Sequence, residues 1–128
     1  MRALTVKQPW AWAILHAGKR IENRSRKPPE WAIGTVIALH AGQSLDESGV
    51  VWLRRRGFAV PDDLPRGVIA GSMRITGVIE KPIDDIWWQG PVGWSLDNVT
   101  PLPEPIPCSG QLGLWSVPDE LAKLIDNK

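Results

Sequence analysis

Three charged residues lie close together near the start of the chain, in the order Lys19, Glu22 and Arg24. In an extended segment Glu22 and Arg24 project from the same side, and a turn is needed to bring Lys19 round to join them. Such a group can form a pocket in which Lys19 supplies a positive charge or a nucleophilic or basic amine. Glu22 would hold or deprotonate that amine, and Arg24 would bind a phosphate or the edge of a base. The alternative is a salt-bridge network on the protein surface.

The two histidines offer further candidates. His40 ends a predicted core strand, where it can act as a general acid or base, donate to the edge of a base, or satisfy a buried backbone carbonyl. His16 lies on the helix face opposite Trp10 and is expected to be solvated or half packed. With Cys108 as the one cysteine, the chain has no recognised set of metal ligands and cannot form an internal disulfide. We therefore expect no metal and no cofactor.

Tryptophan is unusually frequent, with eight residues against one phenylalanine and no tyrosine. A tryptophan beside cations can stack an unpaired base, which is how single-stranded nucleic acid is commonly held. Trp10 is expected to border the pocket, and Trp31, Trp87, Trp88 and Trp94 are predicted to lie in or beside loops. The tryptophans at apolar periodic positions are predicted core residues, namely Trp12, Trp52 and Trp115.

Two more arginines are candidates for contacts with nucleic acid. Arg26 follows the charged group, and Arg74 shares one side of a long predicted strand with Ser72. If that side faces the mouth of a barrel, Arg74 joins the site, and otherwise it faces solvent. Residues 1–60 carry ten basic and four acidic groups, whereas residues 61–128 carry five basic and ten acidic groups. A basic half around Lys19 suits a polyanion, although a mixed solvated surface is the alternative.

The elements that position these residues begin with a helix over 10–17, for which Thr5 is the candidate N-cap and Gly18 the terminator. A polar strand or loop follows over 19–26, and a β-branched run starting near Thr35 predicts a central strand that ends at His40. A second helix is predicted to be capped by Ser44 and to end at the triple arginine 54–56. A long strand with glycine bends is predicted over 67–82. Two more strands, over 93–102 and 110–117, are separated by the proline-rich segment 101–107 as an extended loop or edge, and a C-terminal helix follows over 118–128.

Short strands with glycine bends and two or three helices predict an α+β fold, a small mixed-strand β-barrel decorated by helices. The length of 128 residues predicts a single domain over 1–128. The absence of a GxGxxG or Walker loop gives no support to a nucleotide-cofactor fold. No apolar run approaches the ~20 residues that span a bilayer, and no cleavage signal is visible. We therefore expect a cytoplasmic protein with no membrane partner.

Three parts of the chain resemble the ASCH family, whose members are small PUA-like β-barrels associated with RNA. The segment LTVKQPWAWAILHAGKRIENR is similar to the family's opening helix and its signature of Lys, Glu and Arg, here Lys19, Glu22 and Arg24. GTVIALHAG resembles the strand that ends in a His-Ala pair at His40 and Ala41. LPRGVIAGSMRITGVIE and GWSLDNVTPLPEPIPCSGQLGLW resemble the glycine-bounded strand and the closing strand pair. The resemblance implies one PUA-like ASCH domain.

Three hypotheses of function follow. In the first, an RNA-interacting ASCH module binds an unpaired or modified nucleotide, from RNA or from a nucleoside-type small molecule, in a cleft between the first helix and the barrel. Lys19, Glu22, Arg24 and His40 would line this cleft, Trp10 would form an apolar wall, and Arg26 and Arg74 would add contacts. In the second, the same cleft is a metal-independent hydrolase, either a ribonuclease or an N4-acetylcytidine-type amidohydrolase, with Lys19, Glu22 and His40 as catalytic residues. In the third, an exposed patch at Trp87 and Trp88 makes the protein an interaction adaptor.

Overall fold

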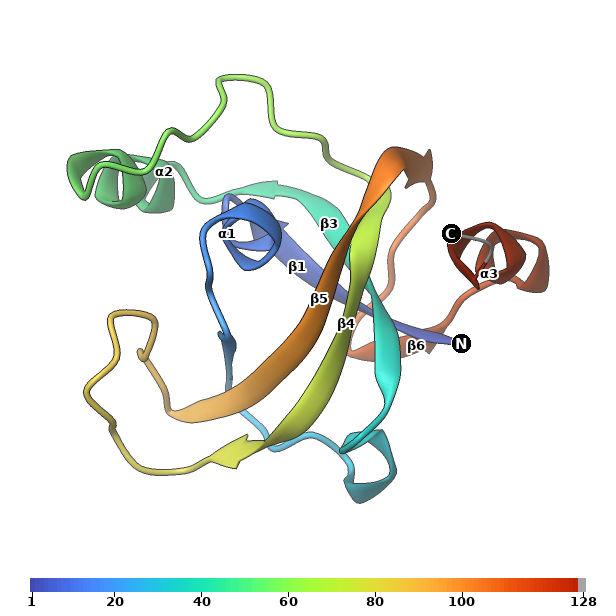
Figure 1. Ribbon diagram of the computed structural model, residues 1–128, viewed down its shortest axis with the longest axis horizontal. Coiled ribbons are helices and arrows are strands. Elements are labelled where there is room, and N and C mark those ends of the chain that lie inside the picture. Colours follow the sequence, from blue (N-terminus) through green and yellow to red (C-terminus); the bar gives the residue numbers. More distant parts are fainter. Residues whose placement is uncertain (127–128) are drawn as a thin grey trace.

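Six strands form one strongly curved mixed sheet in the computed structural model, which describes residues 1–126 (Figure 1). Their order across the sheet is β2-β5-β4-β3-β1-β6, with β1 parallel to β3 and all other neighbours antiparallel. The strands are β1 (Arg2–Gln8), β2 (Ile21–Arg24), β3 (Val36–Leu45), β4 (Val68–Ile79), β5 (Val92–Pro107) and β6 (Leu114–Ser116). The helices are α1 (Trp10–His16), the 3₁₀ helix η1 (Glu30–Ala32), α2 (Glu47–Arg55) and α3 (Asp119–Asp126).

The predicted α+β class and the mixed-strand sheet with helices are confirmed. The barrel is only approximate, because β2 and β6 form the two edges of the sheet and do not pair with each other. The long strands β4 and β5 run side by side and give the sheet its curvature (Figure 1). Three register shifts interrupt their pairing, and such bulges bend and twist a strand pair.

The first strand, β1, is not predicted from the sequence, which instead suggests Thr5 as the N-cap of the following helix. Thr5 lies inside β1, opposite His40 of β3. Ala3 and Leu4 are fully buried because β1 lies between β3 and β6 in the sheet. A strand covered on both faces lacks the alternation of polar and apolar residues that marks a half-exposed strand, so its pairing partners decide its conformation.

Helix α1 agrees closely with the prediction and ends in a turn that directs Lys19 into β2. Gly18 has a φ of +77°, a left-handed conformation that glycine adopts readily. At the other end of the helix, the buried side chain of Gln8 holds the first turn in place. Its Oε1 accepts the backbone N–H of Trp12 at 2.9 Å, and its Nε2 donates to the carbonyl oxygen of Pro65 at 2.9 Å.

Helix α2 is capped by Asp46 and not by Ser44, which corrects the prediction. The Asp46 Oδ1 atom accepts the backbone N–H of Gly49 at 3.1 Å. Gly49 weakens a helix on propensity alone, but a Cβ at this position would lie 2.7 Å from Cζ2 of Trp10. The glycine therefore allows α2 to pack directly against the indole that begins α1.

The proline-rich segment continues β5 and does not separate two strands. Its alternate residues Leu102 and Ile106 pack in an apolar cluster with Trp115 and the α3 residue Ile125. The intervening prolines lack an N–H group, and they are tolerated because this part of β5 has β4 on one side only. The prediction that segment 101–107 is an extended edge is thus confirmed, whereas the prediction that it interrupts the strand is wrong.

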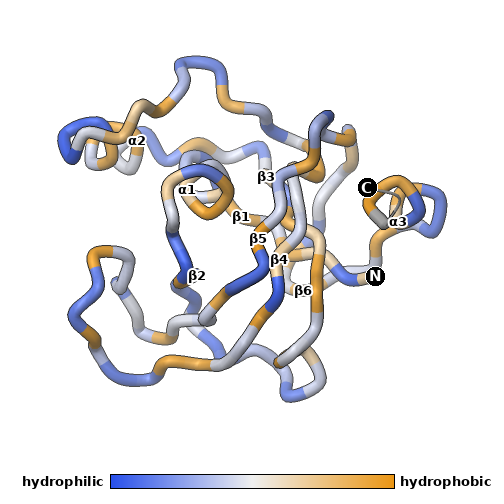
Figure 2. The backbone as a smooth tube through the Cα atoms, viewed as in Figure 1, coloured by the Kyte–Doolittle hydropathy of each residue, from blue (hydrophilic) through white to orange (hydrophobic). Residues whose placement is uncertain are grey.

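Three of the eight tryptophans, Trp87, Trp94 and Trp115, are buried, and four of the others are partly buried. Trp115 is buried as predicted, whereas Trp94, expected beside a loop, is a buried residue of β5. Trp31, in η1, is 52% exposed. Figure 2 shows that apolar residues are spread over the sheet, whereas β2 is markedly hydrophilic. Within residues 1–126, no helix is long and apolar enough to cross a membrane.

Substitution of Gly71 by alanine should destabilise the fold by about 1–3 kcal/mol, as is typical of overpacking. A Cβ there would lie 2.5 Å from the carbonyl oxygen of Thr100 and 2.7 Å from Cδ2 of Leu15, and the backbone oxygen cannot move aside. Gly77→Ala, in the same strand, is the matched control because its Cβ would meet only the Ser95 hydroxyl, at 3.3 Å. Urea unfolding of both variants measures the difference, and equal losses of stability would contradict this account of the β4 and β5 contact.

Candidate functional site

A cavity of about 530 Å³ opens beside α1 and β2. This volume lies within the range of about 300–1,000 Å³ that is typical of small-molecule sites. Segments that are far apart in the sequence form its walls: the second half of β1, Trp10 of α1, Lys19 with β2, the end of β3, Trp52 of α2, and two loops over 86–89 and 111–113.

The cavity has a buried floor and an exposed rim. Lys19 and Glu22 are 3% and 7% exposed, although both are charged. By contrast, Ile86 and Leu112 are 57% and 98% exposed, and they belong to the two loops that border the opening. Charged groups at the floor are therefore shielded from water, which strengthens their interactions with anything that enters.

Lys19 is held at the floor by two acceptors. Its Nζ donates to the carbonyl oxygen of Ile21 and lies 3.4 Å from Oε1 of Glu22. Burial lowers the pKa of the Lys19 ammonium below its ordinary value of 10.5, and the nearby Glu22 carboxylate only partly opposes this effect. The amine is thus easier to deprotonate than an exposed lysine.

Glu22 bridges Lys19 to Arg24. Its second oxygen, Oε2, accepts from the Arg24 Nε atom at 3.1 Å. The three side chains therefore form one continuous ionic chain, with exposed side-chain fractions of 4% for Lys19, 9% for Glu22 and 27% for Arg24. A salt-bridge network on the surface, the alternative considered from the sequence, does not describe a group that is buried to this extent.

Arg24 also joins two strands that are not neighbours in the sheet. Its Nη2 donates to the carbonyl oxygen of Thr5 in β1 at 2.7 Å, although three strands separate β2 from β1 in the hydrogen-bonding order. The guanidinium carbon lies 5.8 Å from the centre of the Trp94 ring. This side chain thus links the edge strand β2 to the part of β1 that extends beyond its pairing with β6.

Three tryptophans from separate elements line one wall. The ring centres of Trp10 and Trp52 are 6.0 Å apart, and those of Trp52 and Trp87 are 5.8 Å apart. The Trp10 indole N–H donates to the Oδ2 atom of Asp46 at 3.0 Å, which fixes its orientation. The hydrogen bond from Ser48, followed by those from Trp10 and Gly49, lowers the pKa of Asp46 despite some desolvation. Trp52 was predicted as a core residue, but it also lines the cavity.

The adaptor hypothesis requires exposed indoles at Trp87 and Trp88, and the structure contradicts this. Trp87 is only 8% exposed because its ring packs against Trp52 and Phe58. Trp88 is half-buried in the same apolar cluster. The loop is held inward by Asn23, whose Nδ2 donates to the carbonyl oxygen of Trp87 and whose Oδ1 accepts the N–H groups of residues 89 and 90.

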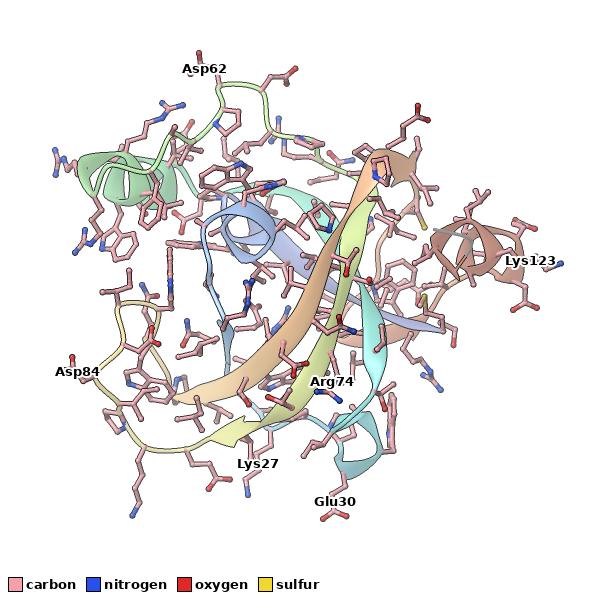
Figure 3. All side chains as sticks on the ribbon, in the orientation of Figure 1. Lys27, Glu30, Asp62, Arg74, Asp84 and Lys123 are labelled. Carbon is pink, nitrogen blue, oxygen red and sulfur yellow. The ribbon has the colours of Figure 1, made fainter. Side chains whose placement is uncertain are left out.

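His40, Arg26 and Arg74 lie outside the residues that line the cavity, so the structure does not join them to Lys19. His40 is 1% exposed, and its Nε2 donates to the carbonyl oxygen of Cys108 at 2.6 Å. Arg74 faces solvent and forms a two-pronged ion pair with Asp97 at 2.8 and 2.6 Å (Figure 3). Arg26 is exposed beyond the end of β2.

Several lining residues carry no local signal in the sequence. Lys7 is an exposed cation of β1, and the amide or hydroxyl side chains at the cavity belong to residues such as Gln43, Ser44, Gln89 and Gln111. Three cations, Lys7, Lys19 and Arg24, face the single carboxylate of Glu22 among the lining residues, so the cavity is positively charged. Within residues 1–126, no group of three or more histidine, cysteine, aspartate or glutamate residues is placed to hold a metal ion.

The fold and the cavity together define a small α+β domain with a basic, tryptophan-walled pocket. The sequence matches no protein-family model and no curated protein. Among solved structures, the chain is similar to ASCH from Zymomonas mobilis, with a TM-score of 0.58 over 98% of this chain and 93% of that chain. The two sequences are 15% identical, so the likeness concerns the fold. The likeness of the fold to an ASCH structure, which the sequence motifs predict, is thus confirmed.

The free energy of unfolding should depend on the protonation of Lys19 at alkaline pH. Its pKa is lowered in the folded protein, so between that pKa and 10.5 the unfolded chain binds more protons than the folded chain. The contribution of Lys19 to the free energy of unfolding therefore rises with pH in the window between its folded-state pKa and 10.5, by at most about 1.4 kcal/mol per pH unit. Lys19→Met should lack this rise.

Urea unfolding of the wild-type protein and of Lys19→Met between pH 7 and 10.5 tests this expectation. The quantity compared is the difference between their free energies of unfolding at each pH. Cys108 and Lys27, whose pKa values are raised in the folded protein, contribute the opposite slope, but they contribute equally to both curves. The absence of tyrosine removes another group that titrates in this range. A constant difference between the two proteins across the window would contradict the lowered pKa of Lys19.

Proposed function

We propose that this chain is an ASCH-type domain that interacts with RNA by binding one unpaired or modified nucleotide in the tryptophan-walled cavity. The observation that carries the proposal is the buried ionic chain of Lys19, Glu22 and Arg24 on the floor of a cavity large enough for a nucleoside. Burial of three charges costs free energy and adds little net stability by itself. A role in recognising a polar ligand accounts for their position.

The remaining walls suit a nucleotide better than an apolar ligand. A base is a flat ring with a polar edge, and the indoles of Trp10, Trp52 and Trp87 provide apolar surface against which such a ring can pack. Lys7 lies nearer the solvent, where a phosphate of the nucleotide would remain hydrated. A cavity of about 530 Å³ would accept one nucleotide, and it is too small for a duplex.

Single-stranded RNA of mixed sequence should bind with an affinity that decreases as salt rises, since each phosphate contact releases counterions. Lys7→Gln should weaken binding by about three- to tenfold and reduce the salt dependence by about one contact. Lys123→Gln makes the same change of charge on α3, which lies on the opposite side of the molecule from α2, and should bind normally (Figure 3). Quenching of tryptophan fluorescence measures both affinities. An affinity that does not change between low and moderate salt would contradict the proposal.

A metal-independent hydrolase in the same cavity is the second candidate, and the lowered pKa of the Lys19 amine favours it. A neutral Lys19 can accept a proton from water, and the resulting hydroxide can attack the acetyl carbonyl of an N4-acetylcytidine. The amine of cytidine then leaves with the proton returned by Lys19, and acetate is released. On RNA the same amine can deprotonate a ribose 2′-hydroxyl. His40 takes no part because it does not line the cavity.

If the protein is such a hydrolase, Lys19→Met should reduce turnover of N4-acetylcytidine or of RNA by about 10²–10⁴-fold, the usual contribution of a general base. The rate for the wild-type protein should rise with pH through the pKa of Lys19. Chromatography of the products measures both. Equal background rates for the wild-type protein and Lys19→Met on both substrates would exclude catalysis and leave the binding function in place.

A further inference from the structure

The hydrogen-bonding groups on the cavity floor follow a fixed order. The Lys19 ammonium has three N–H groups, of which Ile21 and Glu22 accept two, so one is left for the cavity. The Arg24 guanidinium uses the N–H of Nε for Glu22 and one N–H of Nη2 for Thr5, which leaves both N–H groups of Nη1 and the second N–H of Nη2. The carboxylate of Glu22 lies between them: Oε1 accepts a hydrogen bond from Lys19 and Oε2 accepts one from Arg24, and each oxygen retains a further lone pair. The floor therefore presents donor, acceptor, donor.

We infer that this floor selects a base whose edge presents a ring N–H beside a carbonyl, and most strongly uracil, over cytosine and adenine. The inference rests on the proposed binding of a nucleotide. The pairing edge of uracil carries a carbonyl oxygen, an N–H and a second carbonyl oxygen, which is the complement of the order on the floor. Glu22 would accept the N3–H of uracil, while Lys19 and Arg24 would donate to its O4 and O2 atoms.

The same order disfavours cytosine and adenine. Each presents a ring nitrogen lone pair at the position where Glu22 requires a donor, and an amino group where Lys19 or Arg24 requires an acceptor. Hypoxanthine has one carbonyl beside its ring N–H and satisfies two of the three groups. It should therefore rank between uracil and the two amino bases.

Burial turns this mismatch into selectivity. The side chains of Lys19 and Glu22 are at most 9% exposed, so water does not readily compensate a lost hydrogen bond on the floor. A site built to hydrogen-bond a ligand rejects analogues that leave its buried polar groups unpaired. One well-matched pair of hydrogen bonds to a base discriminates by about 1–3 kcal/mol, or about 5- to 150-fold in affinity.

The test compares nucleoside 5′-monophosphates, which have the same phosphate group and the same net charge and differ only in the base. Uridine monophosphate should bind the wild-type protein at least about tenfold more tightly than cytidine or adenosine monophosphate, with inosine monophosphate between them. A 3-methyluridine monophosphate keeps both carbonyls but lacks the N–H, and it should bind like the cytidine nucleotide. Calorimetry gives the four affinities and that of the methylated control.

The role of Glu22 is tested with Glu22→Gln, whose neutral amide must turn an NH₂ group toward one of the two cations. This variant should lose the preference for uridine over 3-methyluridine monophosphate. Glu80→Gln is the matched control, since Glu80 is exposed, pairs with Lys27 and does not line the cavity. A thermal melt establishes whether Glu22→Gln folds. If this variant does not fold, the nucleotide affinities of the wild-type protein alone decide whether the cavity prefers uracil.

The possible outcomes distinguish a failure of base selectivity from a failure of nucleotide binding. Equal affinities for the uridine, cytidine and adenosine nucleotides, or tight binding of the 3-methyluridine nucleotide, would overturn the selectivity while the nucleotide-binding function stands. Absence of binding for all monophosphates and for single-stranded RNA would overturn both. A preference for uridine that disappears with N3 methylation would support the inference directly.

Discussion

The ionic chain of Lys19, Glu22 and Arg24 is the interaction on which both the architecture and the site depend. Arg24 reaches from the edge strand β2 to the Thr5 carbonyl of β1, so two strands of the curved sheet that do not pair with each other are linked by a side chain. Glu22 makes that position favourable by neutralising part of the buried positive charge. The cavity lies between β2 and the second half of β1, and its floor consists of polar, hydrogen-bonding side chains.

The cavity wall depends on close approaches between elements that are distant in the sequence. Gly49 lets α2 pack against the Trp10 indole, and the three hydrogen bonds of Asn23 draw the loop over 86–90 inward, so that Trp87 packs on Trp52. A tryptophan surface built from three elements is better defined than one on a single loop, because each ring is packed against another. These packed rings form the surface against which we propose that the base of a nucleotide packs.

Local patterns in the sequence were sufficient for elements whose stability is largely local. The limits of α1, the acids and bases at the two ends of α2, and the glycine-bounded strand β4 all follow from residue types at short spacing. Strand β1 and the continuity of β5 were not predictable in this way. Both depend on partners that lie far along the chain, and the prolines of β5 are acceptable only at an edge, a property that topology decides.

The sequence by itself indicated a charged group: the spacing of Lys19, Glu22 and Arg24 after a glycine turn predicted a pocket with Trp10 beside it. Only the tertiary structure decided that this group is buried, and that it faces Trp52, Trp87 and Lys7. It also decided that His40 and Arg74 lie elsewhere. The reason is physical: spacing along one segment sets the order of neighbouring side chains, whereas burial and convergence depend on how distant segments pack around them.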